Sequence, residues 1–147
     1  MDTPNDGAMA VLQRLLAALN AHDLDALVAC FADDYVNETP AHPRRGFRGS
    51  SQVRTNWTQL FAGVPDLRAL VSRTAVDGET LWTEWDISGS RPDGAAFLMR
   101  GVVIFGVADN AIASARFYLE PVEETSGGVD VHTHRVLGNN TTQEAIS

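Results

Sequence analysis

The hydrophobic period of this chain changes once, at Pro65, and that single change limits the folds it can adopt. Before Pro65, apolar residues recur every three or four positions, which is typical of helices with one buried face. After Pro65, segments alternate apolar and polar residues or are continuously apolar, as strands are. Helices followed by a run of strands predict an α+β protein in which helices cover one face of a sheet.

Three helices are expected before the change of period. Apolar spacing predicts the first over residues 8–19, and Asp23 can cap a second that carries apolar residues as far as Phe31. Ser50 or Ser51 can cap a third, which Gly63 and Pro65 stop. Between the second and third helices, a short strand is predicted at Tyr35–Thr39, followed by a loop rich in proline and arginine.

The second half predicts a meander of four strands and then a tail. The strands cover residues 67–76, 81–90, 95–107 and 111–122, and the segments DGE, RPDG and ADN between them are typical of turns in antiparallel hairpins. From Glu123 the chain is polar and contains glycine. We therefore expect one domain over residues 8–123 and a polar, loosely packed tail over 124–147.

Composition excludes several classes of function. A net charge of −8 disfavours binding to nucleic acids or anionic membranes, although three arginines in the loop could serve an anionic ligand. All eleven basic residues are arginine, so no lysine is present to form a Schiff base. The single cysteine, Cys30, rules out an intrachain disulfide. With no signal peptide and no apolar run long enough to span a membrane, we expect a cytoplasmic protein.

No cofactor or metal is expected. His132 and His134 would share a face if their segment were extended, but no third ligand accompanies them.

The run QRLLAALNAHDLDALVACFADD, followed by a strand, an arginine-containing loop and a GSSQVR helix, resembles the nuclear transport factor 2-like superfamily. The relatives it resembles most are SnoaL-like polyketide cyclases, ketosteroid isomerases and limonene epoxide hydrolase. The likeness covers residues 8–123. It implies a cone-shaped, curved antiparallel sheet wrapped on three N-terminal helices, with a pocket between them. It also implies a homodimer built on the outer face of the sheet.

The catalytic residues of those families are absent at the matching positions. Thr39 stands where the isomerases have a general-base aspartate, and Leu15 and Trp57 stand where they have tyrosines. Val103 replaces their protonated aspartate. Phe117 occupies the last-strand aspartate position of the cyclases and the epoxide hydrolase. The resemblance therefore implies a fold and a pocket, but no known set of catalytic residues.

Strand alternation indicates which side chains face the pocket. One face of the sheet would carry Trp85, Ile87, Met99, Gly101, Val103, Phe105, Phe117 and Leu119. The opposite face would carry Trp82, Glu84, Asp86, Arg100, Arg116, Tyr118 and Glu120, unless a β-bulge reverses part of the assignment. With the helices added, the predicted pocket lining is Leu15, Trp57, Phe61, Trp85, Met99, Val103 and Phe117.

Four polar residues are candidate catalytic groups. Asn37 and Thr39 have inward parity and could orient a substrate or water, or could bond only to nearby backbone. His42, in the loop, could reach the pocket mouth as an acid or base, or could be exposed. Glu120 becomes an acid or base only if a bulge turns it inward; otherwise it belongs to a surface ion network with Glu84, Arg100 and Arg116.

Three functions remain open. The chain is an isomerase, cyclase or hydrolase that acts without a cofactor on a small, largely apolar molecule. Alternatively, the same cone binds such a molecule without turning it over. In the third reading Trp57, Trp85 and Met99 fill the cone, which then serves only for dimerisation.

Overall fold

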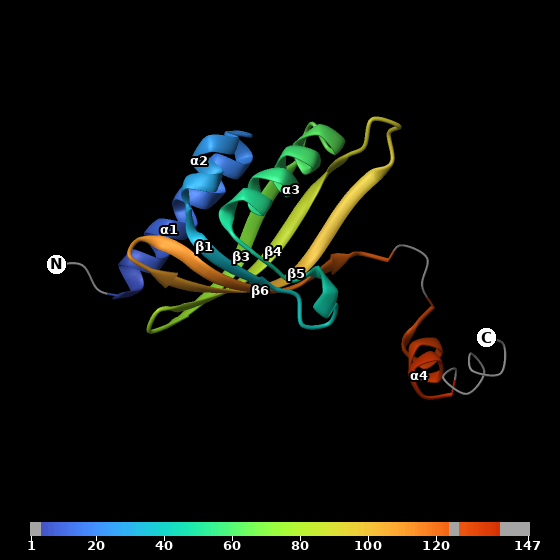
Figure 1. The fold of residues 1–147 in the computed structure, drawn as a ribbon. Helices are drawn as coiled ribbons and strands as arrows, with labels where there is room; N and C mark the ends of the chain where they lie inside the picture. The colour runs from blue at the N-terminus through green and yellow to red at the C-terminus, as the bar shows by residue number, and fades with distance from the viewer. Residues whose placement is uncertain (1–3, 124–126, 139–147) are drawn as a thin grey trace.

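The computed structural model describes residues 4–123 and 127–138 (Figure 1). The helices are α1 (Pro4–Asn20), α2 (Leu24–Ala29), α3 (Ser50–Gly63) and α4 (Val129–Leu137), with one 3-10 turn, η1 (Pro43–Arg45). The strands are β1 (Phe31–Glu38), β2 (Phe47–Arg48), β3 (Arg68–Asp77), β4 (Thr80–Ser90), β5 (Ala96–Ala108) and β6 (Ala111–Pro121). The α+β class and the change from helices to a meander at Pro65 are confirmed.

The helix ends follow from local chemistry. The Asp23 side chain accepts a hydrogen bond from the backbone N–H of Ala26, so the predicted cap of α2 is confirmed. That helix is shorter than predicted, because Phe31 is the first residue of β1. The predicted serine cap of α3 is wrong: Gly49, at φ 96°, is the capping residue, and Ser50 is already helical.

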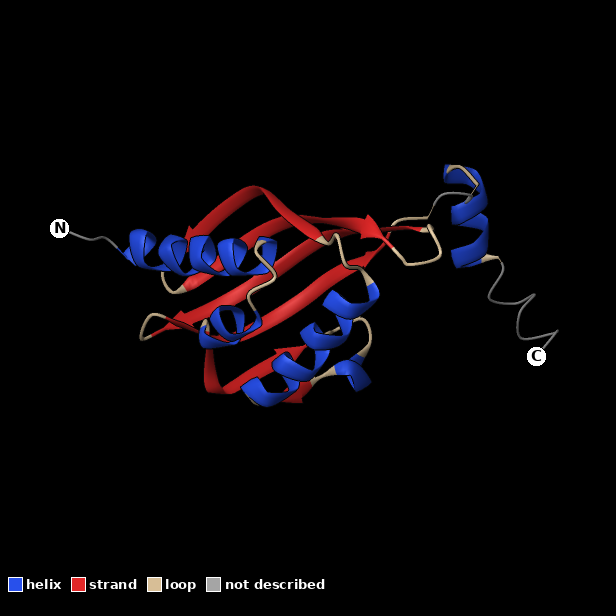
Figure 2. Ribbon diagram, turned by 90° about the horizontal axis from the view of Figure 1, so that it is seen from above, coloured by secondary structure: helices blue, strands red, loops and turns tan. Residues whose placement is uncertain are grey.

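The six strands form one sheet in the order β2-β1-β6-β5-β4-β3. Strands β3 to β6 pair antiparallel, while β1 pairs parallel with β6, with Asn37 opposite Ala115. Seen from above, α1, α2 and α3 lie over one face of the sheet (Figure 2). Since parallel strands end at the same edge, the loop after β1 lies beside the end of β6.

Gly101 marks the bend in β5. Its φ of 152° is rare for residues with side chains, and a Cβ built there would lie 2.8 Å from the Leu119 Cα and would also meet the Tyr118 carbonyl. Glycine at such a point allows the backbones of β5 and β6 to approach closely while the sheet curves. The curved sheet in Figure 1 is the wall of the cone.

The two faces of the sheet differ as the alternation predicted. Along β4, Thr83, Trp85 and Ile87 are buried, while Trp82 and Glu84 are exposed. The register between β5 and β6 shifts at Gly106 and Val107, close to the hairpin that joins the two strands. The candidate residues lie nearer the opposite ends of these strands, so the shift does not change which face they occupy. The predicted inward and outward sets are therefore confirmed.

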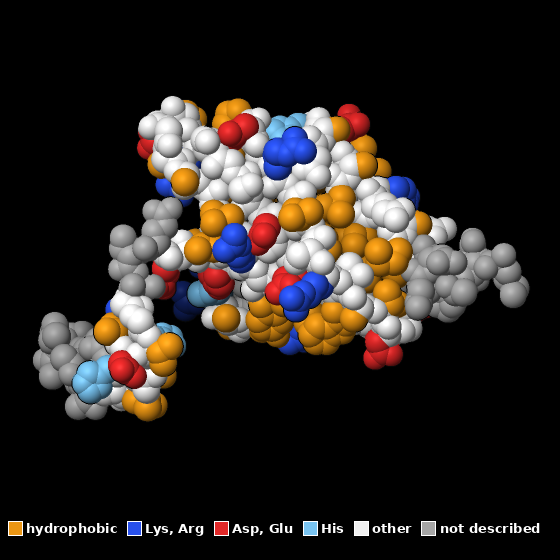
Figure 3. Space-filling model, turned by 180° about the vertical axis from the view of Figure 1, so that it is seen from behind, with side chains coloured by type: hydrophobic (Ala, Val, Ile, Leu, Met, Phe, Trp, Pro, Cys, Tyr) orange, Lys and Arg blue, Asp and Glu red, His pale blue; other side chains and the backbone are white. Residues whose placement is uncertain are grey.

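The outer face carries ion pairs, but not as the predicted four-residue network. Arg100 bonds to Asp86 at 2.8 Å, and the Arg73 guanidinium lies 3.5 Å from Glu84. Arg116 lies 4.0 Å from Glu38 on the neighbouring strand. Seen from behind, hydrophobic side chains gather in patches with acidic and basic side chains between them (Figure 3).

Within the predicted tail, the structure describes residues 127–138, and the rest of the tail lies outside the described part of the chain. Val129–Leu137 forms a helix whose side chains are exposed. His132 and His134 are two positions apart on this helix, so they point to different sides instead of sharing a face. Among the described residues, no cluster of three possible metal ligands occurs. No described helix is both long and apolar enough to cross a membrane.

Candidate functional site

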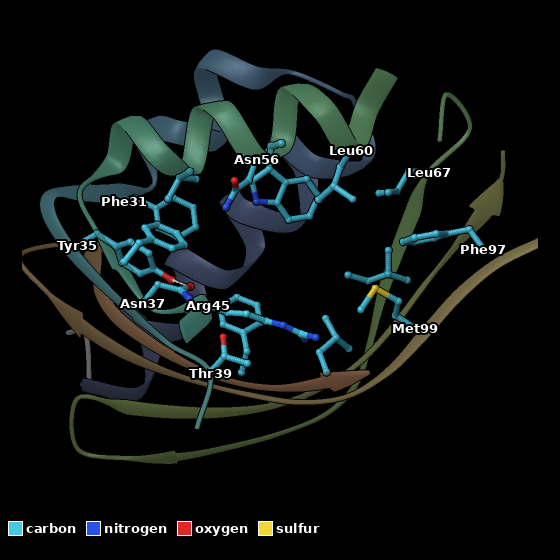
Figure 4. Close-up of a pocket in the computed structure, with 16 residues that line it drawn as sticks. Phe31, Tyr35, Asn37, Thr39, Arg45, Asn56, Leu60, Leu67, Phe97 and Met99 are labelled. Carbon is cyan, nitrogen blue, oxygen red and sulfur yellow. Dashed lines mark hydrogen bonds between the residues drawn. The ribbon is translucent and has the colours of Figure 1, made fainter. Parts of the chain in front are cut away.

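A cavity of about 260 Å³ lies between α3 and the concave face of the sheet. Figure 4 shows α3 on one side of it and the curved strands on the other. It is lined by Phe31, Tyr35, Asn37, Thr39, Arg45, Phe47, Val53, Asn56, Trp57, Leu60, Leu67, Ile87, Phe97, Met99, Phe117 and Leu119. Its volume lies just below the range of about 300–1,000 Å³ that is common for small-molecule sites.

The cavity walls are largely apolar and the cavity is open. Trp57 and Leu60 project from α3, Met99 from β5, and Phe117 and Leu119 from β6. Trp57 and Met99 thus line the space and do not fill it. A cone filled by its own side chains does not describe this structure.

Three of the predicted lining residues, Trp57, Met99 and Phe117, border the cavity, and four do not. Leu15, Trp85 and Val103 are buried in the core, where α1 packs over β3 and β4 and leaves no space. Phe61 stacks on His22 at 4.4 Å between ring centres. Alternation identified the inward face of the sheet, but not how far along each strand the helices cover it.

Asn37 forms the buried polar end of the cavity. The Tyr35 hydroxyl donates a 2.7 Å hydrogen bond to Asn37 Oδ1, and both side chains are buried. Burial raises the pKa of Tyr35, so the phenol is neutral and remains a donor. Asn37 Nδ2 donates no hydrogen bond within the described residues, where no fully buried side-chain polar atom lacks a partner. This amide nitrogen is therefore accessible from the cavity.

Asn56 supplies a second amide from α3. Its Oδ1 accepts a 2.9 Å hydrogen bond from Gln52 Nε2 one helical turn earlier, which leaves its nitrogen on the cavity side (Figure 4). Thr39 and Arg45 complete the polar lining. Sequence reasoning missed Asn56, and it considered the loop arginines for an anionic ligand without placing Arg45 in the pocket lining. The available signals were the position of Asn56 beside Trp57 on the third helix and the cluster of arginines in the loop.

The predicted catalytic residues fall into two places. Asn37 and Thr39 line the cavity, whereas His42 and Glu120 contact each other at 2.6 Å outside its lining. Glu120 has outward parity on β6, and the loop after β1 brings His42 to it along the parallel pair. Both side chains remain partly exposed, at 40% and 46%. Among the described residues that line the cavity, none is acidic and none is a histidine or a cysteine.

A wider groove of about 870 Å³ adjoins the cavity. The two share Arg45, Asn56, Leu60, Phe97 and Met99. The groove adds Arg91, Pro92 and Asp93 from the turn between β4 and β5. The cavity therefore opens toward this turn, and a ligand longer than the cavity would extend along the groove.

A bent sheet that closes an apolar pocket against N-terminal helices defines a cone-shaped protein of the nuclear transport factor 2-like class. Within that class, the chain belongs to the SnoaL-like domain family, whose sequence profile matches residues 12–115.

Solved structures share this fold. An epoxide hydrolase from Mycobacterium tuberculosis that resembles limonene epoxide hydrolase has a TM-score of 0.67 at 23% identity, over 78% of this chain and 83% of its own. A candidate ketosteroid isomerase from Kribbella flavida scores 0.65 at 20% identity, over 84% of each chain. Another Mycobacterium tuberculosis protein, solved with estradiol-17beta-hemisuccinate, scores 0.66 at 21% identity, over 76% of this chain and 92% of its own. At these identities the likeness shows the fold alone.

Proposed function

We propose that the cone cavity binds a small, largely apolar molecule that presents a hydrogen-bond acceptor to Asn37. The observation that carries this proposal is the Tyr35–Asn37 hydrogen bond at the end of an apolar cavity. Because Tyr35 occupies the amide oxygen, Asn37 offers a donor held in one orientation. A few fixed polar groups in an apolar pocket give a ligand both affinity and orientation.

The geometry favours binding without turnover as the primary function. An acid or base in catalysis must come within hydrogen-bond reach of the proton that it moves. The described cavity lining has amides, the hydroxyls of Tyr35 and Thr39, and a guanidinium, but no group that exchanges protons readily near neutral pH. The Mycobacterium tuberculosis protein that was solved in complex with estradiol-17beta-hemisuccinate has the same fold, which supports an apolar ring system as the occupant here.

A cofactor-independent isomerase, cyclase or hydrolase is the second candidate, and the His42–Glu120 contact favours it. A carboxylate that bonds one imidazole nitrogen orients the ring, so that the other nitrogen can accept a proton. The backbone N–H of His42 donates to the Thr39 carbonyl at 2.7 Å, which places the pair beside a cavity residue. A substrate that extends out of the cavity past Thr39 would bring its reacting atoms toward this pair.

Blocking the cavity tests the primary proposal. Met99→Trp would fill the space, while Leu70→Trp adds the same side chain at a position that is 61% exposed. The probes are 1-indanone and 1-tetralone, small ring ketones with one acceptor, together with the parent hydrocarbon indane, measured by ligand-observed NMR. We expect saturable ketone binding in the wild type and in Leu70→Trp, and none in Met99→Trp. Asn37→Leu should weaken the ketones by about tenfold and indane much less. Equal binding to both tryptophan variants would refute a cavity site.

The second candidate is tested with a panel of cyclic ketones and epoxides, followed for turnover. If the pair is catalytic, His42→Ala and Glu120→Gln should each lower kcat by about 100-fold or more, while Met99→Trp removes binding. Turnover that is equal in the wild type and both variants, or absent in all three, would leave binding as the function.

We also propose that the outer face of the sheet pairs with a second copy of the chain. Trp82 and Tyr118 are 47% and 41% exposed on this face, and aromatic residues are enriched at protein–protein interfaces. Alternating arginine and carboxylate side chains surround them, so two copies related by a two-fold axis could pair opposite charges.

A further inference from the structure

The polar groups that reach the cavity are biased toward donors. Asn37 and Asn56 both have their amide oxygens occupied by other side chains, which leaves their N–H₂ groups for a ligand. Arg45 can only donate, and the Thr39 hydroxyl can donate as well as accept. A neutral ketone would use one or two of these groups and leave the others without an acceptor.

Arg45 is set apart by its place in the cavity lining; the lack of an ion pair it shares with other described arginines, such as Arg44 and Arg48. Arg54, Arg73, Arg100 and Arg116 each lie within 4.0 Å of a carboxylate on another element. Arg45 has no such partner within the described residues, although it lines the cavity and extends in Figure 4 from the Thr39 side toward Met99. Its backbone is fixed close to the cavity, because its N–H donates to the His42 carbonyl at 2.9 Å and His42 is itself bonded to Thr39.

From these observations we infer that the ligand carries a carboxylate, and that Arg45 together with the amides of Asn37 and Asn56 selects it over neutral analogues. This inference rests on the proposed function and names its ligand class: a small apolar ring or chain that ends in a carboxylate. The planar guanidinium fork matches a carboxylate, and amide N–H donors make stronger hydrogen bonds to an anion than to a carbonyl.

A monoanion fits better than a phosphate. Arg45 is the only cationic side chain in the described cavity lining, and the chain as a whole has a net charge of −8. One guanidinium balances one carboxylate, whereas a dianion would enter with a charge left unbalanced against an acidic protein. The turn at the adjoining groove carries Arg91 and Asp93 together and so adds no net charge, which leaves Arg45 as the cation that would balance the ligand.

Matched acids and amides test the inference. The probes are benzoate, 2-naphthoate and biphenyl-4-carboxylate, each paired with its primary carboxamide, which keeps the shape and removes the charge. Dissociation constants are measured by calorimetry and NMR at low salt. We expect the best-fitting acid to bind about tenfold or more tightly than its amide, because only the acid forms charge-assisted bonds.

Two arginine variants assign the effect to the cavity. Arg45→Gln should raise the dissociation constant of that acid by about tenfold and change that of its amide by less than about twofold. Arg44→Gln is the control, since Arg44 is an exposed neighbour in the same loop, of the same charge, and lies outside the cavity lining. Its effect should stay below about twofold, as expected of a charge that does not touch the ligand.

The outcomes separate this inference from the proposed function. If acids and amides bind equally, the inference that the ligand carries a carboxylate is wrong. The same holds if the acids lose equal affinity in both arginine variants. Either result would leave an apolar cavity site. If neither these probes nor the ring ketones bind, the proposed function is wrong, and the inference of a carboxylate ligand is wrong with it.

Discussion

The hydroxyl of Tyr35 and the amide oxygen of Asn37, two positions apart on β1, are joined by a 2.7 Å hydrogen bond in a buried setting. Both side chains point to the cavity side of the strand, because residues i and i+2 share a face. One of them therefore orients the other, and Asn37 presents its nitrogen to whatever occupies the cone.

Removing this hydroxyl should cost stability. We expect Tyr35→Phe to lower the free energy of unfolding by about 1–2 kcal/mol, because Asn37 Oδ1 loses its buried partner. The control is Tyr118→Phe, which removes the same atom from the other tyrosine of the chain, where it is 41% exposed. Urea unfolding of both variants is the measurement, and equal losses would contradict a special role for the Tyr35–Asn37 bond.

Alkaline titration should show that Tyr35 is protected. Burial raises the pKa of its phenol above the ordinary value of about 10, so folding favours the neutral form. This contribution to stability is complete below pH about 10 and is lost as the pH rises through the folded-state pKa. In Tyr118→Phe, where Tyr35 is the remaining tyrosine, we expect phenolate absorbance to appear only together with unfolding.

The same variant unfolded in concentrated guanidinium serves as the reference, with phenolate appearing near pH about 10. A phenolate signal at that pH in the folded protein would mean that Tyr35 is not buried as described.

Gly101 should tolerate no side chain. Gly101→Ala combines a strained backbone with a Cβ that meets β6, and we expect a loss of about 3 kcal/mol or more. Gly63→Ala is the matched control, because a Cβ there has nothing within 4 Å and the position is helical. We expect that change to be neutral or to stabilise by up to about 1 kcal/mol. Similar thermal unfolding of the two variants would show that the close approach at Gly101 is unimportant.

The proposed pairing of outer faces predicts a dimer that Trp82 holds together. Trp82→Asp should raise the dissociation constant of the dimer by at least about tenfold, since it removes an aromatic anchor and adds a charge. Val136→Asp on α4 is the control, with 49% exposure against 47% for Trp82. Sedimentation of the wild type as a monomer at high concentration would rule out the pairing.

Most of the fold could be predicted from the sequence, because each helix or strand shows its own hydrophobic period within one segment. The helical spacing of residues 8–19 and the alternation along β4 each record which side is buried. The inward positions of Asn37 and Thr39 followed from the same rule. The short strand β2 was missed, because two residues are too few to show a period.

The candidate site depends on which segments lie side by side in space, and the hydrophobic period of a single segment does not show this. Nothing local shows that β1 lies parallel to β6, yet that pairing brings His42 to Glu120. In the same way, the inclusion of Leu15 and Trp85 in the lining failed because α1 covers that end of the sheet. Arg45 reaches the cavity only because η1 turns the loop back beside Thr39.

Along the paired stretch from Met99 to Phe105 of β5 and its partners on β6, side chains alternate between the two faces, so the sheet is a wall whose sides can be changed separately. Met99, Phe117 and Leu119 shape the interior, and the residues between them shape the exterior. Substitutions on one side leave the side chains of the other side in place, so the cavity can be reshaped without altering the outer face that we propose for pairing. Gly101 is an exception on this wall, because a side chain there would meet the backbone of β6 whichever side were being changed.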